Sequence, residues 1–114
     1  MGEQVRQRQV PIIGAGQGLW SFVHIEDAAF ATVAALECAP GVYNIVDDNP
    51  CKQREWLPAF ARYCGAPEPL QVTEPEALAA SCADSVYYAT NLRGASNEKA
   101  RREFDFRPRP LEWI

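Results

Sequence analysis

With 114 residues, 47% of them apolar, and a formal net charge of −4, the chain is long enough for a single domain over residues 1–114 with a core of moderate size. Its 11 lysines and arginines are scattered, which excludes the concentrated basic face that nucleic-acid binding needs. No run of about 18 apolar residues is present, so we expect a cytoplasmic protein that does not span a membrane.

The first elements in chain order are two short strands separated by a glycine turn. The run Gln9–Ile13 is typical of a strand at a sheet edge, because its proline cannot donate a ladder hydrogen bond. Gly14, Gly16 and Gly18 permit a tight turn, and the aromatic and β-branched side chains of Trp20–Ile25 predict a second strand. We expect the rest of the chain to pack against this unit.

An alanine-rich helix is predicted to follow at once. It covers Asp27–Glu37, and the acidic residues at its start suit the positive end of a helix. Phe30, Val33 and Leu36 share one side of it, with alanines on the outside. This spacing predicts that the three larger side chains face the core.

A third strand and a second helix are predicted in the middle of the chain. Val42–Val46 is typical of a buried strand, and an Asp/Asn-Pro turn follows it. The helix covers Arg54–Cys64 and begins no earlier than Gln53, because Pro58 is tolerated best within a first turn. Its apolar residues fall at i, i+3, i+4, i+7 and i+8 and predict one buried stripe: Trp56, Ala59, Phe60, Tyr63 and Cys64.

A short strand and two helices complete the prediction. The strand covers Leu70–Thr73, and Thr73 with Glu76 forms a capping box for a helix over Glu76–Leu92. A last helix covers Asn97–Phe104, and an extended, proline-rich segment follows, with Phe106 and Trp113 as its anchors. The elements together predict an α/β fold, α+β-like as an isolated piece, in which a small mixed sheet of three to four short strands packs with four helices.

The glycine turn differs from a dinucleotide-binding fingerprint. Such a fingerprint needs glycine or alanine at its sixth position and a helix directly afterwards, whose N-terminus holds the pyrophosphate. Counting from Gly14, the sixth residue is Leu19, and a strand is predicted next. We therefore expect no NAD or NADP to be bound by this chain alone.

The remaining polar clusters favour structural roles. His24 stands alone, which favours a histidine with satisfied hydrogen bonds over a general base. Asp47 and Asp48 are adjacent and predict a turn rather than a pair of catalytic carboxylates. Reduced thiols are expected rather than metal ligands, because no Cys-x-x-Cys pair occurs among the four cysteines: Cys38, Cys51, Cys64 and Cys82.

Four segments of the chain carry a family resemblance. They are GxGxGxWSFVHIEDAA from Gly14, GVYNIVDDNP from Gly41, REWLPAFARYCGAP from Arg54 and LRGASNEKARREFDFRP from Leu92. Together they resemble the C-terminal part of an extended short-chain dehydrogenase/reductase of the NAD-dependent epimerase/dehydratase superfamily. The resemblance covers almost the whole chain. It implies the smaller, substrate-binding part, which in full-length members packs on a Rossmann domain that binds NAD or NADP.

The catalytic machinery of that family has no counterpart in the sequence. The family uses a tyrosine with a lysine four residues later, and its nucleotide-binding half begins with a glycine-rich turn. A lysine at that spacing is missing after each of the four tyrosines, Tyr43, Tyr63, Tyr87 and Tyr88. The resemblance therefore implies no catalytic residue here, and we do not expect activity from the chain by itself.

The resemblance and the side chains together indicate four substrate-binding residues. Trp20 and Ser21 stand where many nucleotide-sugar enzymes of the family carry an arginine, which favours a more apolar ligand. Arg93, beside a glycine, can present its guanidinium to a carboxylate or phosphate, or else interact with the negative end of a helix. Together with Asn44 these residues form the predicted site for a small, partly apolar ligand.

Three functions remain open from the sequence. The leading interpretation is a substrate-binding-type domain derived from this family, without oxidoreductase or epimerase activity alone. The first alternative is half of a split epimerase/dehydratase that a separate Rossmann-fold chain completes, and the second is an oligomeric small-ligand-binding or scaffolding protein. Apolar surface that faces the Rossmann domain in full-length relatives, around Ile12, Trp20, Phe22 and the alanine-rich helix, predicts a homodimer.

Overall fold

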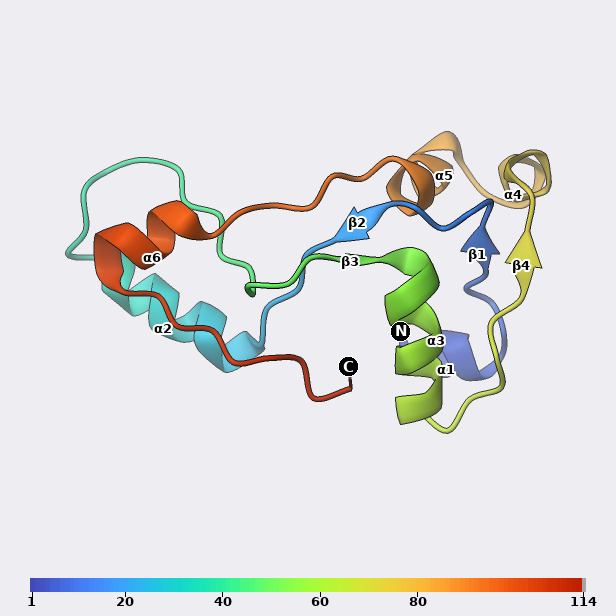
Figure 1. Ribbon diagram of the computed structural model, residues 1–114, viewed down its shortest axis with the longest axis horizontal. Coiled ribbons are helices and arrows are strands. Elements are labelled where there is room, and N and C mark those ends of the chain that lie inside the picture. The colour runs from blue at the N-terminus through green and yellow to red at the C-terminus, as the bar shows by residue number, and fades with distance from the viewer. Residues whose placement is uncertain (114) are drawn as a thin grey trace. The chain divides into compact units, whose positions relative to one another are not determined.

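The computed structural model in Figure 1 describes residues 1–113 and contains, within them, six helices and four two-residue strands. The mixed α/β content predicted from the sequence is confirmed. The helices are α1 (Gly2–Arg6), α2 (Ile25–Ala35), α3 (Gln53–Tyr63), α4 (Glu74–Ala80), α5 (Ala83–Thr90) and α6 (Glu98–Phe104). The strands are β1 (Ile12–Ile13), β2 (Leu19–Trp20), β3 (Cys51–Lys52) and β4 (Gln71–Val72).

The chain divides into two compact units. The first unit consists of residues 1–20 and 51–93 with Trp113, and it holds all four strands together with α1, α3, α4 and α5. The second unit consists of residues 21–50 and 94–112 and holds α2 and α6. The single domain expected for residues 1–114 stays a prediction, and Ile114 lies outside the described residues.

The four strands of the first unit form two sheets rather than one. β1 pairs in parallel with β4, placing Ile12 opposite Gln71, and β2 pairs antiparallel to β3, placing Trp20 opposite Cys51. The predicted strands near β1, β2 and β4 are thus present but shorter than expected. The predicted strand Val42–Val46 is wrong, because this segment of the second unit joins no ladder among the described residues.

Helix α3 forms the centre of the first unit. Trp56 is 1% exposed and Leu57 is fully buried, whereas Tyr63, which the predicted stripe placed inside, is 59% exposed. The stripe is therefore correct at Trp56 and wrong at Tyr63. Pro58 is the sixth residue of α3 rather than part of its first turn, so the helical hydrogen bond to the Arg54 carbonyl is missing.

The helix predicted over Glu76–Leu92 is broken into α4 and α5. The Thr73 half of the predicted capping box is confirmed, since the Glu76 amide donates to Thr73 Oγ1 (3.3 Å), while Glu76 Oε1 accepts from the Thr73 hydroxyl (3.1 Å). Ser81 then leaves the helical conformation (φ −143°, ψ −156°), and its hydroxyl donates to the Ala77 carbonyl (2.9 Å). The Ser81 amide also donates to the Ala77 carbonyl (2.8 Å), so α4 keeps its last ladder bond and ends at Ser81.

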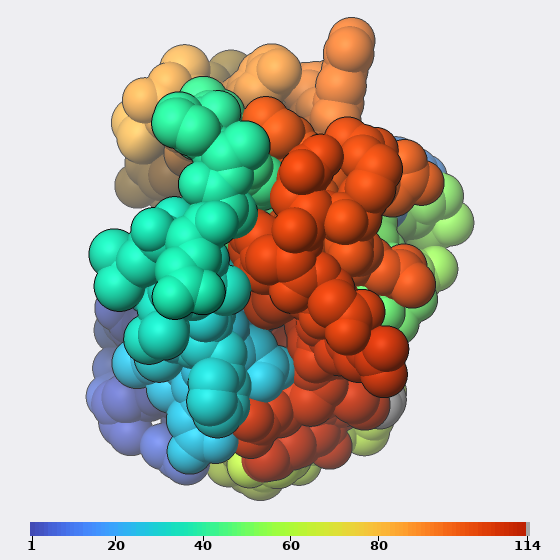
Figure 2. Space-filling view, turned by 90° about the vertical axis from the view of Figure 1, so that its left-hand side faces the viewer, coloured from blue at the N-terminus to red at the C-terminus, as the bar shows by residue number. Residues whose placement is uncertain are grey.

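In the second unit, residues 21–50 lie beside residues 94–112 (Figure 2). The core here consists of Ala31, Ala100 and Phe106, so the predicted anchoring role of Phe106 is confirmed. The predicted inner face of α2 is wrong, because the buried residues of this helix are Asp27 and Ala31. The larger apolar side chains are exposed instead: Phe30, Val33 and Leu36.

Candidate functional site

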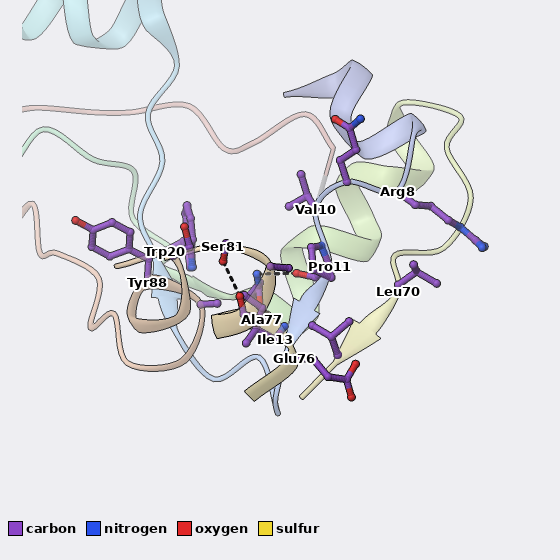
Figure 3. Close-up of a pocket in the computed structure, with 16 residues that line it drawn as sticks. Arg8, Val10, Pro11, Ile13, Trp20, Leu70, Glu76, Ala77, Ser81 and Tyr88 are labelled. Carbon is purple, nitrogen blue, oxygen red and sulfur yellow. Dashed lines mark hydrogen bonds between the residues drawn. The ribbon is translucent and has the colours of Figure 1, made fainter. Parts of the chain in front are cut away.

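A cavity of about 510 Å³ lies in the first unit, between β1, β4, α4 and α5 (Figure 3). Ligand pockets in proteins commonly measure about 300–1,000 Å³, so this cavity has the size for a small molecule. Most side chains around it are apolar, among them Val10, Pro11, Leu70 and Val72. A pocket of this character favours a ligand that buries an apolar body.

Small side chains on α4 and α5 leave the room for this pocket. Ala77 and Ala89 are buried and pack with Ile13 and Val86 in a core cluster of the first unit. Ala77, Ala89 and Ile13 also line the pocket, together with Ala80. Larger side chains at the alanine positions would fill the space, so the alanines set the pocket's size.

Trp20 forms one wall of the pocket and is held by other aromatic rings. Its ring lies 5.2 Å from that of Trp56, centroid to centroid, at an interplanar angle of 54°. The Trp56 ring in turn meets that of Trp113 edge-on at 6.2 Å, which confirms Trp113 as an anchor. The indole N–H of Trp20 is buried and finds no hydrogen-bond acceptor among residues 1–113.

Gln53 ties the pocket wall to helix α3. Its side chain is buried, its Oε1 accepts from the Ile13 amide (3.1 Å), and its Nε2 donates to the Pro11 carbonyl (3.3 Å). These bonds fix β1 against the start of α3, so Gln53 positions two pocket-lining residues. Sequence reasoning missed it, because its partners lie about forty positions earlier and no local pattern marks the pairing.

Arg8 lies at the pocket in an unusual backbone conformation. Its φ of 56° is left-handed, and it follows α1 in a Schellman motif, with Arg8 N–H donating to Val5 (3.0 Å) and Gln9 N–H donating to Gln4 (2.8 Å). Glycine is the usual residue there, since a left-handed conformation costs other residues about 1–2 kcal/mol. Arginine at this position is therefore not what the turn itself prefers.

Two of the predicted site residues, Trp20 and Arg93, belong to the first unit. Trp20 lines the pocket, whereas the exposed Arg93 does not. The Arg93 backbone instead pairs with Leu19 in an isolated parallel bridge. Of these two residues, the pocket therefore uses only the tryptophan.

Ser21 and Asn44, the other two predicted site residues, belong to the second unit. The Ser21 hydroxyl accepts a hydrogen bond from the Ala95 amide (2.8 Å), which gives it a structural role within that unit. Asn44 is exposed. A ligand role for the four residues together stays a prediction.

The glycine turn of the first unit does not fit the pyrophosphate of a dinucleotide. A Cβ at Gly16, which has φ +58°, would lie 2.9 Å from the Arg54 nitrogen, and a Cβ at Gly18 would meet the carbonyl oxygen of Tyr88. The glycines thus allow close packing against α3 and α5. Strand β2 follows the turn, as predicted, and the first amides of α3 already donate to the turn, from Gln53 to the Gly18 carbonyl (3.0 Å) and from Arg54 to the Gly16 carbonyl (3.1 Å).

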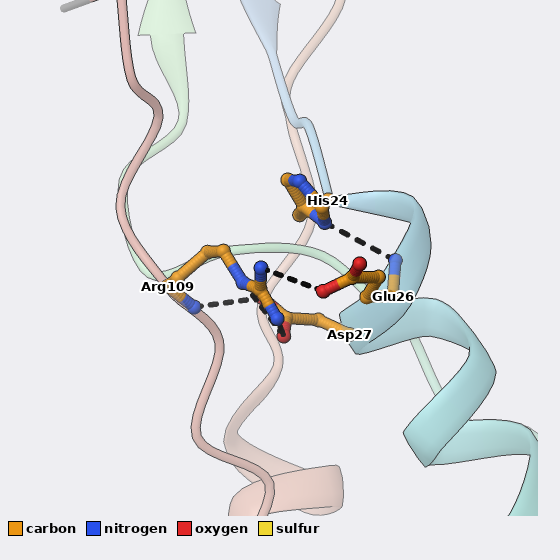
Figure 4. A network of polar contacts seen from close by, with 4 residues as sticks. All are labelled: His24, Glu26, Asp27 and Arg109. Carbon is orange, nitrogen blue, oxygen red and sulfur yellow. Dashed lines mark hydrogen bonds and ion pairs between the residues drawn. The ribbon is translucent and has the colours of Figure 1, made fainter.

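A polar network surrounds the start of α2 in the second unit (Figure 4). Asp27 accepts from the Arg109 amide (2.8 Å) and guanidinium (3.1 Å), and Glu26 lies 3.0 Å from the same guanidinium. The Arg109 amide is the main cause that lowers the pKa of Asp27, and hydrogen bonds to Asp27 and then Glu26 raise the pKa of Arg109. His24 caps the helix, because its Nδ1 accepts from the Glu26 amide (3.1 Å). This network fixes structure, as expected for His24.

The remaining titratable clusters show no ligand chemistry. Burial raises the pKa of Asp47, whose Oδ1 accepts from the Asn49 amide (3.2 Å) in the predicted turn. Within residues 1–113, no group of three or more His, Cys, Asp or Glu side chains is placed to hold a metal ion. None of the helices in this part of the chain has the length and apolar content to cross a membrane.

Comparison with known proteins shows that the fold is that of the C-terminal portion of an NAD-dependent epimerase, which confirms the predicted resemblance at the level of the fold. No family model matches the chain. Over 108 residues the chain is 38% identical to a 3-diazoavenalumate denitrifying reductase from Streptomyces sp., a match that covers 92% of this chain and 35% of the reductase.

Two solved structures share the fold. The crystal structure of gox2253 matches 96% of this chain with a TM-score of 0.67 at 17% identity. The crystal structure of the UDP-glucuronic acid 4-epimerase from Bacillus cereus, in complex with NAD, matches 97% with a TM-score of 0.61 at 19% identity. The chain spans 39% of gox2253 and 35% of both the epimerase and the reductase, little more than a third of each.

Proposed function

We propose that the chain is a substrate-binding-type domain of the epimerase and reductase kind, and that the pocket of the first unit takes a small, partly apolar ligand. The observation that carries the proposal is the pocket itself, which has the volume of a small-molecule site, apolar walls and an aromatic wall at Trp20. The sequence similarity to a reductase supports the same kind of role. That reductase is named for 3-diazoavenalumate, and we propose a small organic ligand here as well.

The chain is proposed to lack oxidoreductase or epimerase activity by itself. The packed glycine turn and the missing Tyr-x-x-x-Lys pair support this. The second candidate is one half of an enzyme that a separate Rossmann-fold chain completes, and the NAD in the epimerase structure favours it. NAD-dependent turnover that requires both chains would distinguish this candidate from an autonomous binding domain.

Filling the pocket at Ala80 is expected to weaken ligand binding at least tenfold without unfolding the protein. Ala80 lines the pocket at the exposed end of α4, so Ala80→Leu places its added atoms in the cavity. Ala79→Leu is the matched control, because Ala79 is an exposed neighbour that does not line the pocket. Calorimetric titration with cinnamamide, a small planar probe, should show at least a tenfold loss of affinity for Ala80→Leu alone. Equal affinities in the two variants would refute the pocket assignment.

We further propose that the chain self-associates as a homodimer through the exposed apolar side of α2. Phe30 is 71% exposed, and Val33 and Leu36 beside it are also mostly exposed, which leaves an apolar patch for a partner surface. Light scattering should give twice the monomer mass of 12.7 kDa. Phe30→Glu should return the mass to that of a monomer, whereas a monomeric wild-type chain would contradict the proposal.

A further inference from the structure

The pocket has one cationic side chain among its otherwise mostly apolar walls. Arg8 is the only lysine or arginine that lines it within residues 1–113. We propose that Arg8 is a specificity-determining residue that pairs with an anionic group of the ligand, so that the pocket takes small carboxylic acids with a flat apolar body. This inference rests on the proposed function of the pocket and names the chemical class of its ligand.

The placement of polar and aromatic groups supports a ligand with two unlike ends. Arg8 and Glu76 both lie away from Trp20 and Tyr88, and the exposed Arg8 side chain extends outwards above Leu70, at the rim of the pocket (Figure 3). In the proposed complex the planar body lies against the apolar walls, and its acidic group meets Arg8 at the rim of the pocket. The guanidinium suits that group, because its N–H donors match the geometry of a carboxylate.

Arg8 is also free of the ion pairs that engage other arginines of the first unit. Arg6 lies 3.4 Å from a carboxylate oxygen of Glu3, and Arg62 lies 3.7 Å from one of Glu68. Arg8 makes no salt bridge within 4.0 Å to any described residue. Its charge is therefore available to a ligand.

The backbone at Arg8 gives a second, independent argument. The left-handed position after α1 is satisfied best by glycine, which has no Cβ. An arginine in this conformation is strained, and residues in strained conformations concentrate at functional sites. A requirement for the side chain at the pocket explains why the turn carries it.

Cinnamate and cinnamamide test the inference, because they share a planar body and differ in charge. By calorimetric titration, the wild-type chain is expected to bind cinnamate about fivefold more tightly than cinnamamide, as fits an exposed ion pair. Arg8→Gln should remove this preference while leaving the affinity for cinnamamide unchanged. Glu76→Gln should increase the preference for cinnamate, since it removes a carboxylate of the pocket lining that repels the carboxylate of the ligand. Arg62→Gln removes the same charge outside the pocket, so this control variant should keep the preference for cinnamate.

A variant that improves folding separates the ligand role from a structural one. Arg8→Gly should melt about 4 °C higher, because glycine relieves the left-handed strain, and should still lose the preference for cinnamate. Equal binding of acid and amide by the wild type, or the same loss in Arg62→Gln, would overturn the role of Arg8 and leave the pocket intact. If neither probe binds, both the pocket and the role of Arg8 are wrong.

Discussion

Replacement of Trp56 by alanine is expected to lower the free energy of unfolding by about 3–5 kcal/mol. The side chain is 1% exposed and packs against Trp20 and Trp113, with ring centroids at 5.2 and 6.2 Å. Its loss removes buried apolar area and leaves a cavity at the centre of the first unit. Urea denaturation followed by far-ultraviolet circular dichroism measures the change.

Tyr63→Ala on the same helix is the matched control for Trp56→Ala. Tyr63 is 59% exposed, so its truncation should cost no more than about 0.5 kcal/mol. Because the Trp56 ring supports Trp20, the Trp56 variant should also bind cinnamamide more weakly under conditions in which it remains folded. A destabilisation below about 1 kcal/mol would show that α3 does not form the core described above.

Replacement of Asp27 by alanine should destabilise the protein by about 2–3 kcal/mol at pH 7, since hydrogen bonds to a buried carboxylate are among the stronger ones. Asp27 is 6% exposed, and both the amide and the guanidinium of Arg109 donate to it. Glu26→Ala is the control, because Glu26 contacts the same guanidinium from an exposed position and should contribute much less. Equal effects of the two variants would contradict the central role of Asp27.

The contribution of Asp27 should depend on pH in a defined direction. The Arg109 amide holds the pKa of Asp27 below its ordinary value of 3.8, so the unfolded state takes up a proton more readily than the folded state. The stabilisation is therefore complete above the ordinary pKa and is lost as the pH falls through the lower pKa of the folded state. The difference between wild type and Asp27→Ala should shrink below about pH 4. A difference that grows on acidification would contradict this sign.

Local sequence patterns predicted the elements whose determinants are close in sequence. The cap of α4 depends on Thr73 and Glu76, which are three positions apart. The glycine turn is likewise a local feature, set by the conformations of Gly14 and Gly16. Such features are visible without knowledge of the tertiary contacts.

The errors arose where a distant partner determines the outcome. Asp27 is buried in α2, whereas Phe30 and Val33 face outwards. This orientation was missed because the partner of Asp27, Arg109, lies 82 positions away and no pattern within the helix indicates the pairing. The predicted strand Val42–Val46 had suitable residues but finds no strand to pair with in the described structure. The helix also breaks at Ser81, which leaves the helical conformation although no proline or glycine marks this position in the sequence.

The candidate site was predicted only in part, for the same reason. Trp20 was expected at the ligand and lines the pocket, whereas Gln53 and Arg8 were missed. Gln53 is a polar residue at the first position of an amphipathic helix. This position indicates a role at the pocket only once β1 is known to lie beside it. The signal for Arg8 was its left-handed conformation, which the sequence does not reveal.

The proposal that the first unit binds a small ligand is tested most directly by nuclear magnetic resonance. Cinnamate would be titrated into the ¹⁵N-labelled wild-type chain while amide and indole signals are followed. The indole signal of Trp20 and the amide signals of Ala77, Ala80 and Ala89, all at the pocket, should shift together with one dissociation constant. The signals of Ala31 and Ala100, in the core of the second unit, should stay unchanged. Shifts confined to the second unit, or no shifts at all, would contradict the account.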